Sequence, residues 1–408
     1  MGMRLRFFTP VQSYLKIKTI CFSKLMSTKN IITMKKVILC LAMLLGVGFA
    51  NHANGKDFVV ELTPEFCKAV QKYDELGSFS EGIAAVKRDG KYGFINAKGE
   101  EVVPCKYDRA GSFSEGMSWV CIGDYDNGKY GFVNAKGEEM VQCKYDEANA
   151  FSEGMAAVKR DGKWGYINAK GEEVVPCKYD RAGSFSEGIA WVCIGDYDNG
   201  RYGFVNAKGE EVVQCKYDEA SGFSEGMAAV KRDGKYGYIN AKGAEVIPCN
   251  YDRVGRFSEG MAAVERDDKW GYINAKGKEI VPCNYYAVYH DAVFDGYAGD
   301  FHEGLATVGL DSKGRCGYIN TKGEEVISGK YDEVRDFHEG VAWVVIGTFL
   351  GDDPDAKCGL INKKGEEIIP CKYDEAWNFS NGVAAVRLKC GDEKYIYGYV
   401  DKFGNTTF

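Results

Sequence analysis

Apolar and polar residues alternate in short runs along most of the chain, and residues that favour tight turns separate these runs. In one stretch, Gly82–Arg88 reads GIAAVKR, Tyr92–Asn96 reads YGFIN and Glu100–Pro104 reads EEVVP. DGK at Asp89–Lys91 joins the first two runs, and Asp-Gly favours the positive φ angles of a tight hairpin. NAKG at Asn96–Gly99 forms a second turn, which Asn opens and Gly closes. The pattern predicts a three-stranded antiparallel meander whose proline marks an edge or a bulge.

This unit of about 34 residues recurs nine times. Each copy contains the phrase FSEG or a variant, then an aromatic-Gly or Cys-Gly pair, and a second glycine six residues later. The nine phrases begin at Phe79, Phe113, Phe151, Phe185, Phe223, Phe257, Phe301, Phe337 and Phe379. One meander has too little core to fold alone, so the copies must stack on one another.

The repeats predict an all-β fold, a tandem array of about nine three-stranded antiparallel β-meander repeats that is open and solenoid-like. The alternative is a closed, β-propeller-like ring. The first eight units end in a KYD-type corner, the ninth ends before reaching it, and an orphan KYD stands at Lys72–Asp74. In the alternative, this orphan and the truncated ninth unit would complement each other, as strand exchange does when a propeller closes.

The composite pattern KWGYIN-KG-E-VIP-YDEA-FSEG-AAV resembles the WG-repeat family of bacterial proteins, also called KWG repeats. Trp-Gly itself stands at Trp164 and Trp270, Tyr replaces the tryptophan in five units, and Cys316 and Cys358 replace it in two. The resemblance covers about residues 70–408. It implies tandem β-rich repeats and no agreed activity.

The N-terminus is a different kind of sequence, with eight Lys or Arg and no Asp or Glu in residues 1–50. Two lysines after Met34 precede a short apolar run and then small residues, which is typical of a secretory signal peptide. We expect residues 1–33 to be a misassigned upstream extension and 34–50 the signal peptide. Residues 51–70 are then an N-terminal lead-in, and residues 71–408 form the repeat domain.

Loss of residues 1–50 would leave 44 Lys or Arg against 59 Asp or Glu, a net charge of −15. An acidic exported protein repels nucleic acid and anionic membrane surfaces. We therefore expect a periplasmic, cell-surface or secreted protein with no membrane span in its mature chain. Its expected partner is a protein or a glycan of the cell envelope.

Apart from one insertion between Tyr285 and Phe301, variation in unit length lies in the first hairpin. Trp119, Trp191 and Trp343 all occur in units whose first hairpin is long, where short units have alanine. Either each tryptophan packs under its own hairpin, or the three form a row of exposed rings that stack on a sugar or a partner. Tips of variable length are also where binding residues usually lie. The candidate tip residues are Asp124, Tyr125, Asp196, Tyr197, Phe349 and Asp352.

Metal and cofactor sites are not expected. The GDYDNGK tip at Gly123–Lys129 and its copy at Gly195–Arg201 fall short of an EF-type calcium loop. His302 and His338 replace the serine of FSEG in neighbouring units and are weak metal candidates. The chain has no CxxC pair, which argues against zinc.

Seven cysteines occupy one repeat position, and we expect them to be small buried apolar residues. They are Cys105, Cys143, Cys177, Cys215, Cys249, Cys283 and Cys371.

Catalysis is not expected, because an active site needs one special place whereas the carboxylate pairs here recur in every unit. The sequence favours an exported, non-catalytic interaction scaffold that binds through its hairpin tips. A carbohydrate- or envelope-binding module that uses the repeat tryptophans is the alternative, and an enzyme is the least favoured class.

Overall fold

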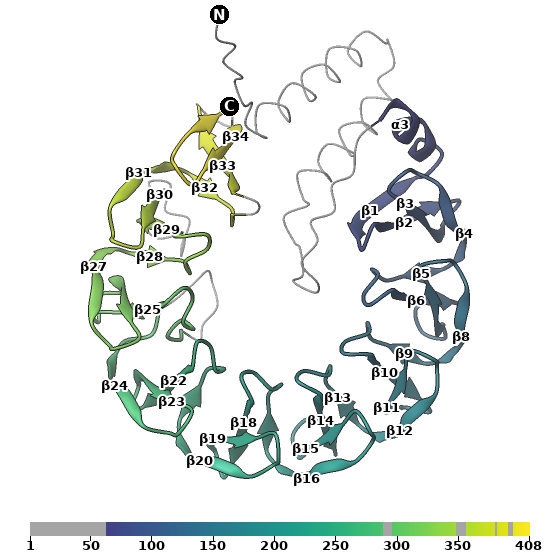
Figure 1. Cartoon of the computed structure of the whole chain (residues 1–408), viewed down its shortest axis with the longest axis horizontal. Helices are drawn as coiled ribbons and strands as arrows, with labels where there is room; N and C mark the ends of the chain where they lie inside the picture. The colour runs from purple at the N-terminus through teal and green to yellow at the C-terminus, as the bar shows by residue number, and fades with distance from the viewer. Residues whose placement is uncertain (1–62, 289–295, 348–355, 380–381, 391–394) are drawn as a thin grey trace, which may run out of the picture.

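The computed structural model describes residues 63–288, 296–347, 356–379, 382–390 and 395–408. In these residues the chain forms nine small antiparallel sheets that follow one another in sequence order along an arc (Figure 1). The arc leaves a gap between the first and the last sheet. The predicted all-β array of nine repeats, open rather than closed, is confirmed.

The described residues contain one helix and thirty-five strands. They are α3 (Pro64–Val70), β1 (Glu75–Ser80), β2 (Ile83–Arg88), β3 (Lys91–Asn96), β4 (Glu101–Tyr107), β5 (Arg109–Ala110), β6 (Met117–Ile122), β7 (Lys129–Asn134), β8 (Glu139–Tyr145), β9 (Glu147–Ala148), β10 (Met155–Arg160), β11 (Lys163–Asn168), β12 (Glu173–Tyr179), β13 (Arg181–Ala182), β14 (Ile189–Ile194), β15 (Arg201–Asn206), β16 (Glu211–Tyr217), β17 (Glu219–Ala220), β18 (Met227–Arg232), β19 (Lys235–Asn240), β20 (Glu245–Tyr251), β21 (Arg253–Val254), β22 (Met261–Arg266), β23 (Lys269–Asn274), β24 (Glu279–Tyr285), β25 (Leu305–Gly309), β26 (Cys316–Asn320), β27 (Glu325–Tyr331), β28 (Glu333–Val334), β29 (Val341–Ile346), β30 (Lys357–Asn362), β31 (Glu367–Tyr373), β32 (Glu375–Ala376), β33 (Val383–Lys389), β34 (Tyr395–Asp401) and β35 (Thr406–Thr407).

Each sheet has the three predicted strands and, in eight of the nine described sheets, a fourth. The extra strand usually has two residues: β5, for example, follows the KYD-type corner and pairs with β6. In the three-stranded seventh sheet, an isolated bridge between Tyr286 and Gly309 takes its place. The third meander strands, such as β4, β8 and β12, lie on the outer rim of the arc (Figure 1).

The two ends of the array do not share a sheet. The orphan KYD leads into the first sheet, where the Asp74 amide donates to the Lys87 carbonyl at 2.7 Å. The ninth sheet instead completes itself with β35, which pairs with β34. The strand exchange that ring closure would require is therefore not formed between the described residues at the two ends.

The turns explain why the repeat conserves Asp-Gly and Glu-Gly pairs. Asp89 and Gly90 have φ of 52° and 76°, the geometry expected of the DGK hairpin. Glu81 and Gly82 have φ of 52° and 78°, so FSEG is itself a tight hairpin turn, which the sequence analysis did not identify. In NAKG, Asn96 Oδ1 accepts the Lys98 and Glu100 amides, both at 3.0 Å.

The glycine of the aromatic-Gly pair is required by a bulge in the outer strand. Between the pairs Tyr92–Tyr107 and Phe94–Val103, β4 has two more residues than β3. The bulge brings the outer strand over Gly93, where a Cβ would lie 2.4 Å from the Val103 carbonyl oxygen. Only glycine fits there, and the other eight units show the same close approach at 2.3 to 2.8 Å.

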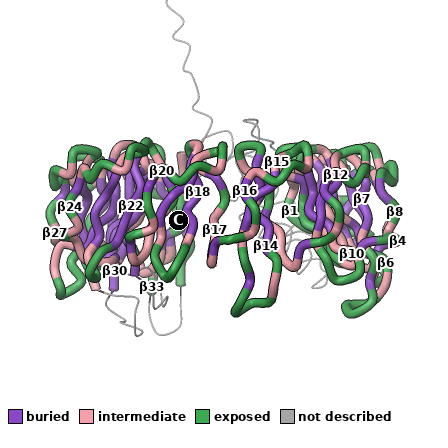
Figure 2. Tube along the Cα trace, turned by 90° about the horizontal axis from the view of Figure 1, so that it is seen from below, coloured by how far each residue is buried: buried purple, intermediate pink, exposed green. Residues whose placement is uncertain are grey.

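The core lies between neighbouring sheets rather than within a single unit, and Figure 2 shows the buried strands continuing around the array. At the first interface, Phe94 of one unit packs edge-on against Phe113 of the next, with ring centroids 5.0 Å apart. Val103 and Tyr107 of the outer strand join Val133 in the same buried cluster. Each sheet is thus stable only with its neighbours, as expected for stacked repeats.

A chain of hydrogen bonds links consecutive FSEG turns. Ser80 Oγ donates to the Phe113 carbonyl at 2.7 Å. The Glu81 carboxylate accepts the Glu115 amide at 2.8 Å and the Gly116 amide at 2.7 Å. Equivalent carboxylate bonds recur along the array as far as Gly382. The repeated serine and glutamate therefore connect units, which explains their recurrence without an active site.

The first hairpins project from one face of the array, and Figure 2 shows the long tips beyond β6 and β14 extending past the body. The NAKG-type turns lie at the opposite ends of the strands. On the tip side, Lys91 Nζ is 2.5 Å from Asp108 Oδ1 of the following corner. The other Asp108 oxygen accepts the Gly123 amide at 2.9 Å, which fixes the base of the long tip.

Helix α3 covers the start of the first sheet. Thr63 caps its N-terminus by accepting the Phe66 amide, and the Phe66 ring packs against Phe79 at 6.1 Å. In the described part of the chain, no helix has the length and apolar character needed to cross a membrane. The expected upstream extension, the signal peptide and residues 51–62 of the lead-in lie outside the described residues.

Candidate functional site

The long tips of the second and fourth sheets present an exposed tyrosine each. Tyr125 is 86% exposed and Tyr197 is 87% exposed. Asp124 and Asp196, both exposed, shape these tips: Asp124 Oδ1 accepts the Asn127 amide at 2.8 Å, and Asp196 Oδ1 makes the equivalent bond at 2.8 Å. The tyrosines therefore stand on turns that are ordered by local hydrogen bonds.

An arginine from the short inner strand supports each of these tips. The Arg109 guanidinium lies between two rings, 5.4 Å from the centroid of Tyr125 and 5.0 Å from that of Tyr130. Arg109 also donates to the Asp124 carbonyl at 3.0 Å. Arg181 repeats the arrangement in the fourth sheet. Such cation–π contacts hold an exposed ring in place and lower the entropy lost when it binds.

Electrostatics strengthen the base of the long tip. The hydrogen bond from Lys91, aided by the Gly123 amide, holds the pKa of Asp108 below its usual value. The hydrogen bond from Lys163 lowers the pKa of Asp180 in the same way. The corner aspartates therefore stay ionised and bonded at neutral pH.

The third long tip, in the eighth sheet, starts with the same anchor: the Gly347 amide donates to Asp332 Oδ2 at 2.8 Å. The predicted tip residues Phe349 and Asp352 lie outside the described residues. The structure thus places four of the six candidate tip residues, and all four are exposed on two equivalent tips.

The three tryptophans share a repeat position but not an environment. Trp119 and Trp191 are half-buried; the Trp119 ring packs over Gly111 and lies 5.4 Å from Tyr130. Trp343 is 3% exposed, stacks on Phe379 at 5.8 Å and donates from Nε1 to a carbonyl of the next unit at 2.9 Å. Trp119 thus packs against its own sheet, whereas Trp343 also packs against the next unit.

The two histidines lie close together. The rings of His302 and His338 are 5.8 Å apart, and His302 Nε2 is 3.6 Å from Asp336 Oδ2. Burial raises the pKa of the nearby Asp300. Across the described ranges, no group of three or more His, Cys, Asp or Glu side chains is positioned to hold a metal ion.

The thirteen cysteines of the described residues are free thiols. The seven at the common repeat position are half-buried rather than fully buried as expected, because they lie on the outer edge strand. Burial still raises the pKa of Cys143 and Cys215 to about 11, which disfavours the reactive thiolate.

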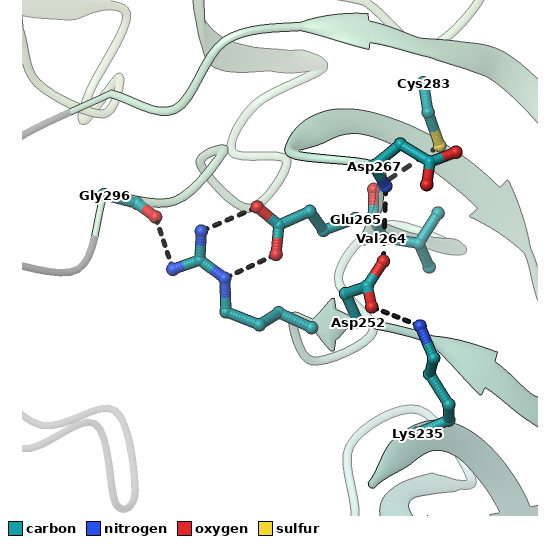
Figure 3. Close-up of polar contacts among 8 residues, drawn as sticks. Lys235, Asp252, Val264, Glu265, Asp267, Cys283 and Gly296 are labelled. Carbon is teal, nitrogen blue, oxygen red and sulfur yellow. Dashed lines mark hydrogen bonds and ion pairs between the residues drawn. The ribbon is translucent and has the colours of Figure 1, made fainter.

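The sixth unit contains an ion pair that was not predicted from the sequence. Arg253 and the buried Glu265 reverse the Glu–Lys pair found at this register in other sheets, such as Glu219 and Lys231. Figure 3 shows the guanidinium bonded to both Glu265 oxygens, at 2.5 and 2.6 Å, and to the Gly296 carbonyl at 3.0 Å. The signal was present in the sequence, since ERD replaces KRD in this unit alone.

Beside this ion pair lies a cavity of about 330 Å³ between the fifth and sixth sheets, which we call the inter-sheet cavity. Its aromatic wall is formed by Tyr236, Trp270 and Tyr297, and its small residues include Ser221 and Ala229. Tyr297 belongs to the insertion that follows the sixth unit. No single stretch of sequence forms this cavity, because two sheets and the insertion contribute to it.

Comparison with solved structures gives distant similarities. A eukaryotic initiation factor is 10% identical over 88% of this chain and 90% of its own, with a TM-score of 0.45. A dipeptidyl peptidase 4 from Porphyromonas gingivalis is 12% identical over 85% of this chain and 61% of its own, with a TM-score of 0.42. With TM-scores below 0.5, neither similarity identifies an activity for the chain. No curated protein sequence matches it.

A protein-family model matches most of the chain. The model of the WG containing repeat matches nine segments, at residues 70–92, 92–125, 130–164, 164–197, 202–236, 236–270, 270–313, 317–347 and 359–389. Most of these segments begin at an aromatic-Gly or Cys-Gly pair, cross the outer strand and end in the first hairpin of the next unit, so each is offset from the sheets by about half a unit. The chain belongs to the WG-repeat family.

Proposed function

We propose that the protein is an exported, non-catalytic scaffold that binds a partner of the cell envelope through its long hairpin tips. The exposure of Tyr125 and Tyr197 is the observation that supports this proposal most strongly. Exposed tyrosines that are held rigid combine a large apolar surface with a hydrogen-bonding hydroxyl, a combination enriched at binding interfaces.

The arrangement of the tips suits a partner that contacts both. The two tips are near-identical in sequence, occur two units apart and project from the same face of the array (Figure 2). Two weak contacts on one body reinforce each other through effective concentration. The exposed Asp124 and Asp196 favour a partner surface that is neutral or basic there.

A pull-down from the envelope fraction of the native host tests this function. The Tyr125→Ser/Tyr197→Ser variant should lose the proteins that the wild-type chain enriches. Phe403→Ser is the matched control, because Phe403 is 75% exposed on a NAKG-type turn at the opposite end of the strands. Equal enrichment by the tip variant and the wild type would refute a role for the tips.

The alternative function is glycan binding through Trp119, Trp191 and Trp343. Trp119 and Trp191 are partly exposed, whereas Trp343 is 3% exposed. A glycan array with wild-type protein and the triple alanine variant separates the two functions. Glycan binding that the triple variant loses while remaining folded would favour this alternative.

Export is also part of the proposal and rests on the sequence of residues 34–50. N-terminal sequencing of protein from the native host should find a start at Asn51 or Asn54. An intact Met1 on cytoplasmic protein would contradict export. The non-catalytic character is supported by the repeated glutamates, such as Glu81, whose carboxylates bond to the next turn.

A further inference from the structure

We propose that the inter-sheet cavity binds a neutral sugar ring. The cavity lies between the fifth and sixth sheets, whereas the described long tips belong to the second and fourth. The inference therefore does not depend on the partner-binding function, and different variants test the two.

The cavity lies at a position where the long units carry a large side chain and the fifth unit does not. Trp119 of the second sheet and Ala229 of the fifth occupy the same repeat position, six residues after the phenylalanine of FSEG. In the second sheet the indole fills the space over Gly111, where a Cβ would lie 2.3 Å from Trp119 Nε1. In the fifth sheet Ala229 faces Ser221 instead, and both line the cavity.

The neighbouring unit and the insertion contribute to this space. Trp270 of the sixth sheet, which is 2% exposed, and Tyr297 of the insertion line it together with Tyr236. The Gly296 carbonyl, adjacent to Tyr297, accepts a hydrogen bond from Arg253, which ties the insertion to the site. A volume of about 330 Å³ falls within the range of small-molecule sites and is large enough for a single ring.

The charges at the cavity cancel in pairs, which selects a neutral ligand. Arg253 is bonded to Glu265 through both carboxylate oxygens. Glu219 accepts hydrogen bonds from Lys231 at 2.7 Å and from Tyr236 at 2.5 Å. A charged ligand would have to compete with one of these pairs, whereas a neutral ligand leaves both intact.

A cationic ligand is further disfavoured because cations of the protein already occupy the rings. The Arg253 guanidinium lies 5.2 Å from the Trp270 ring centroid, and Lys231 Nζ lies 4.9 Å from that of Tyr236. A methylammonium group in this aromatic cage would be repelled by both. An apolar face of a pyranose can pack instead against the Tyr297 ring, which also lines the cavity and is 48% exposed.

One polar group of the wall lacks a partner. Trp270 Nε1 is buried and has no hydrogen-bond acceptor within the described residues. Buried donors are normally satisfied by protein, water or ligand.

Saturation-transfer NMR titration of the full chain with methyl glycosides tests the site. The probes are methyl α-glucopyranoside, methyl α-mannopyranoside, methyl β-galactopyranoside and the methyl β-glycoside of N-acetylglucosamine. At least one should bind with a dissociation constant of about 1 to 10 mM, since a site of this size offers few contacts. Indole serves as the probe for a neutral aromatic ligand.

The main variant is Ser221→Gly/Ala229→Trp, which recreates in the fifth sheet the Gly-Trp pair of the second. It should weaken glycoside binding by about tenfold or more because the indole fills the cavity. The matched control is Ala85→Trp, which places the same ring opposite Gly77 in the first sheet and should leave binding unchanged. Trp270→Tyr, a residue that five other units carry at this position, should weaken binding roughly 2- to 10-fold.

Three results would overturn the proposal. The first is binding by the double variant with wild-type affinity, and the second is an equal loss in the Ala85→Trp control. The third is the absence of binding of all four glycosides up to about 50 mM, whether or not indole binds. If the double variant does not fold, the effect of Trp270→Tyr decides: unchanged glycoside affinity in that variant contradicts the site.

Discussion

Replacing Gly165 with alanine should destabilise the protein by about 1 to 2 kcal/mol more than replacing Gly162 in the same hairpin. A Cβ on Gly165 would lie 2.4 Å from the Val175 carbonyl oxygen and 2.7 Å from the Cys177 amide nitrogen. Both atoms are backbone atoms of the outer strand, so relief requires the bulge to open. We expect a cost of about 3 kcal/mol, the upper range for overpacking, because the strand shift also weakens ladder hydrogen bonds.

Gly162 provides the matched comparison. It has a φ of 76° and nothing within 4 Å of an added Cβ, so Gly162→Ala meets only the strain of left-handed backbone. That strain is about 1 to 2 kcal/mol. Urea and thermal unfolding of both variants, followed by circular dichroism, measure the two costs in the same sheet.

If Gly165→Ala costs no more than Gly162→Ala, the close approach of the outer strand is not what requires glycine in the aromatic-Gly pair. The m-value provides a second check. Because repeats couple to their nearest neighbours, a broken third sheet should broaden the transition rather than only shift its midpoint.

Three further predictions concern contacts of the array. Trp343→Ala should cost about 3 to 5 kcal/mol in unfolding free energy because the ring is buried, and Trp119→Ala should cost clearly less because that ring is half-exposed; equal costs would contradict the different environments. Glu153→Ala should lower the unfolding free energy by about 1 kcal/mol because the carboxylate that accepts two backbone amides is removed, and Glu153→Gln should lower it less because its amide oxygen still accepts. An unchanged unfolding free energy in Glu153→Ala would show that this link is not stabilising. The pKa of Asp180 is lowered in the folded state by its bond from Lys163, so its contribution is present above the carboxyl's unfolded pKa and is lost as pH falls through the folded value. Thermal unfolding of Asp180→Asn between about pH 6 and pH 2 should therefore show a smaller loss of stability on acidification than the wild type, and parallel curves would refute this.

The sequence predicted the array because its signals are local and repeated. Asp89-Gly90 dictates a hairpin whatever surrounds it, and the alternation of Tyr92–Asn96 needs only one buried face. The two-residue strands such as β5 were missed because two residues show no periodicity. The FSEG turn was missed because a glutamate with positive φ is favoured only once its carboxylate bonds to the next unit.

The candidate sites were less predictable because they depend on neighbouring units. Length variation located the long tips, and the structure places Tyr125 and Tyr197 in the open there. Trp119 and Trp343 look equivalent in the repeat, yet one lies over Gly111 and the other under the next sheet. Such differences arise from tertiary contacts between units, which the residue type at a single repeat position does not specify.

The most direct test of the proposed tip function is a quantitative binding measurement on immobilised envelope fraction from the native host. The wild type, Tyr125→Ser, Tyr197→Ser and the double variant would be compared by biolayer interferometry, with Phe403→Ser as the control. We predict that each single variant binds more weakly, that the double variant loses binding by about 100-fold or more, and that the control equals the wild type. Wild-type binding by the double variant would contradict the claim that the tips form the binding face.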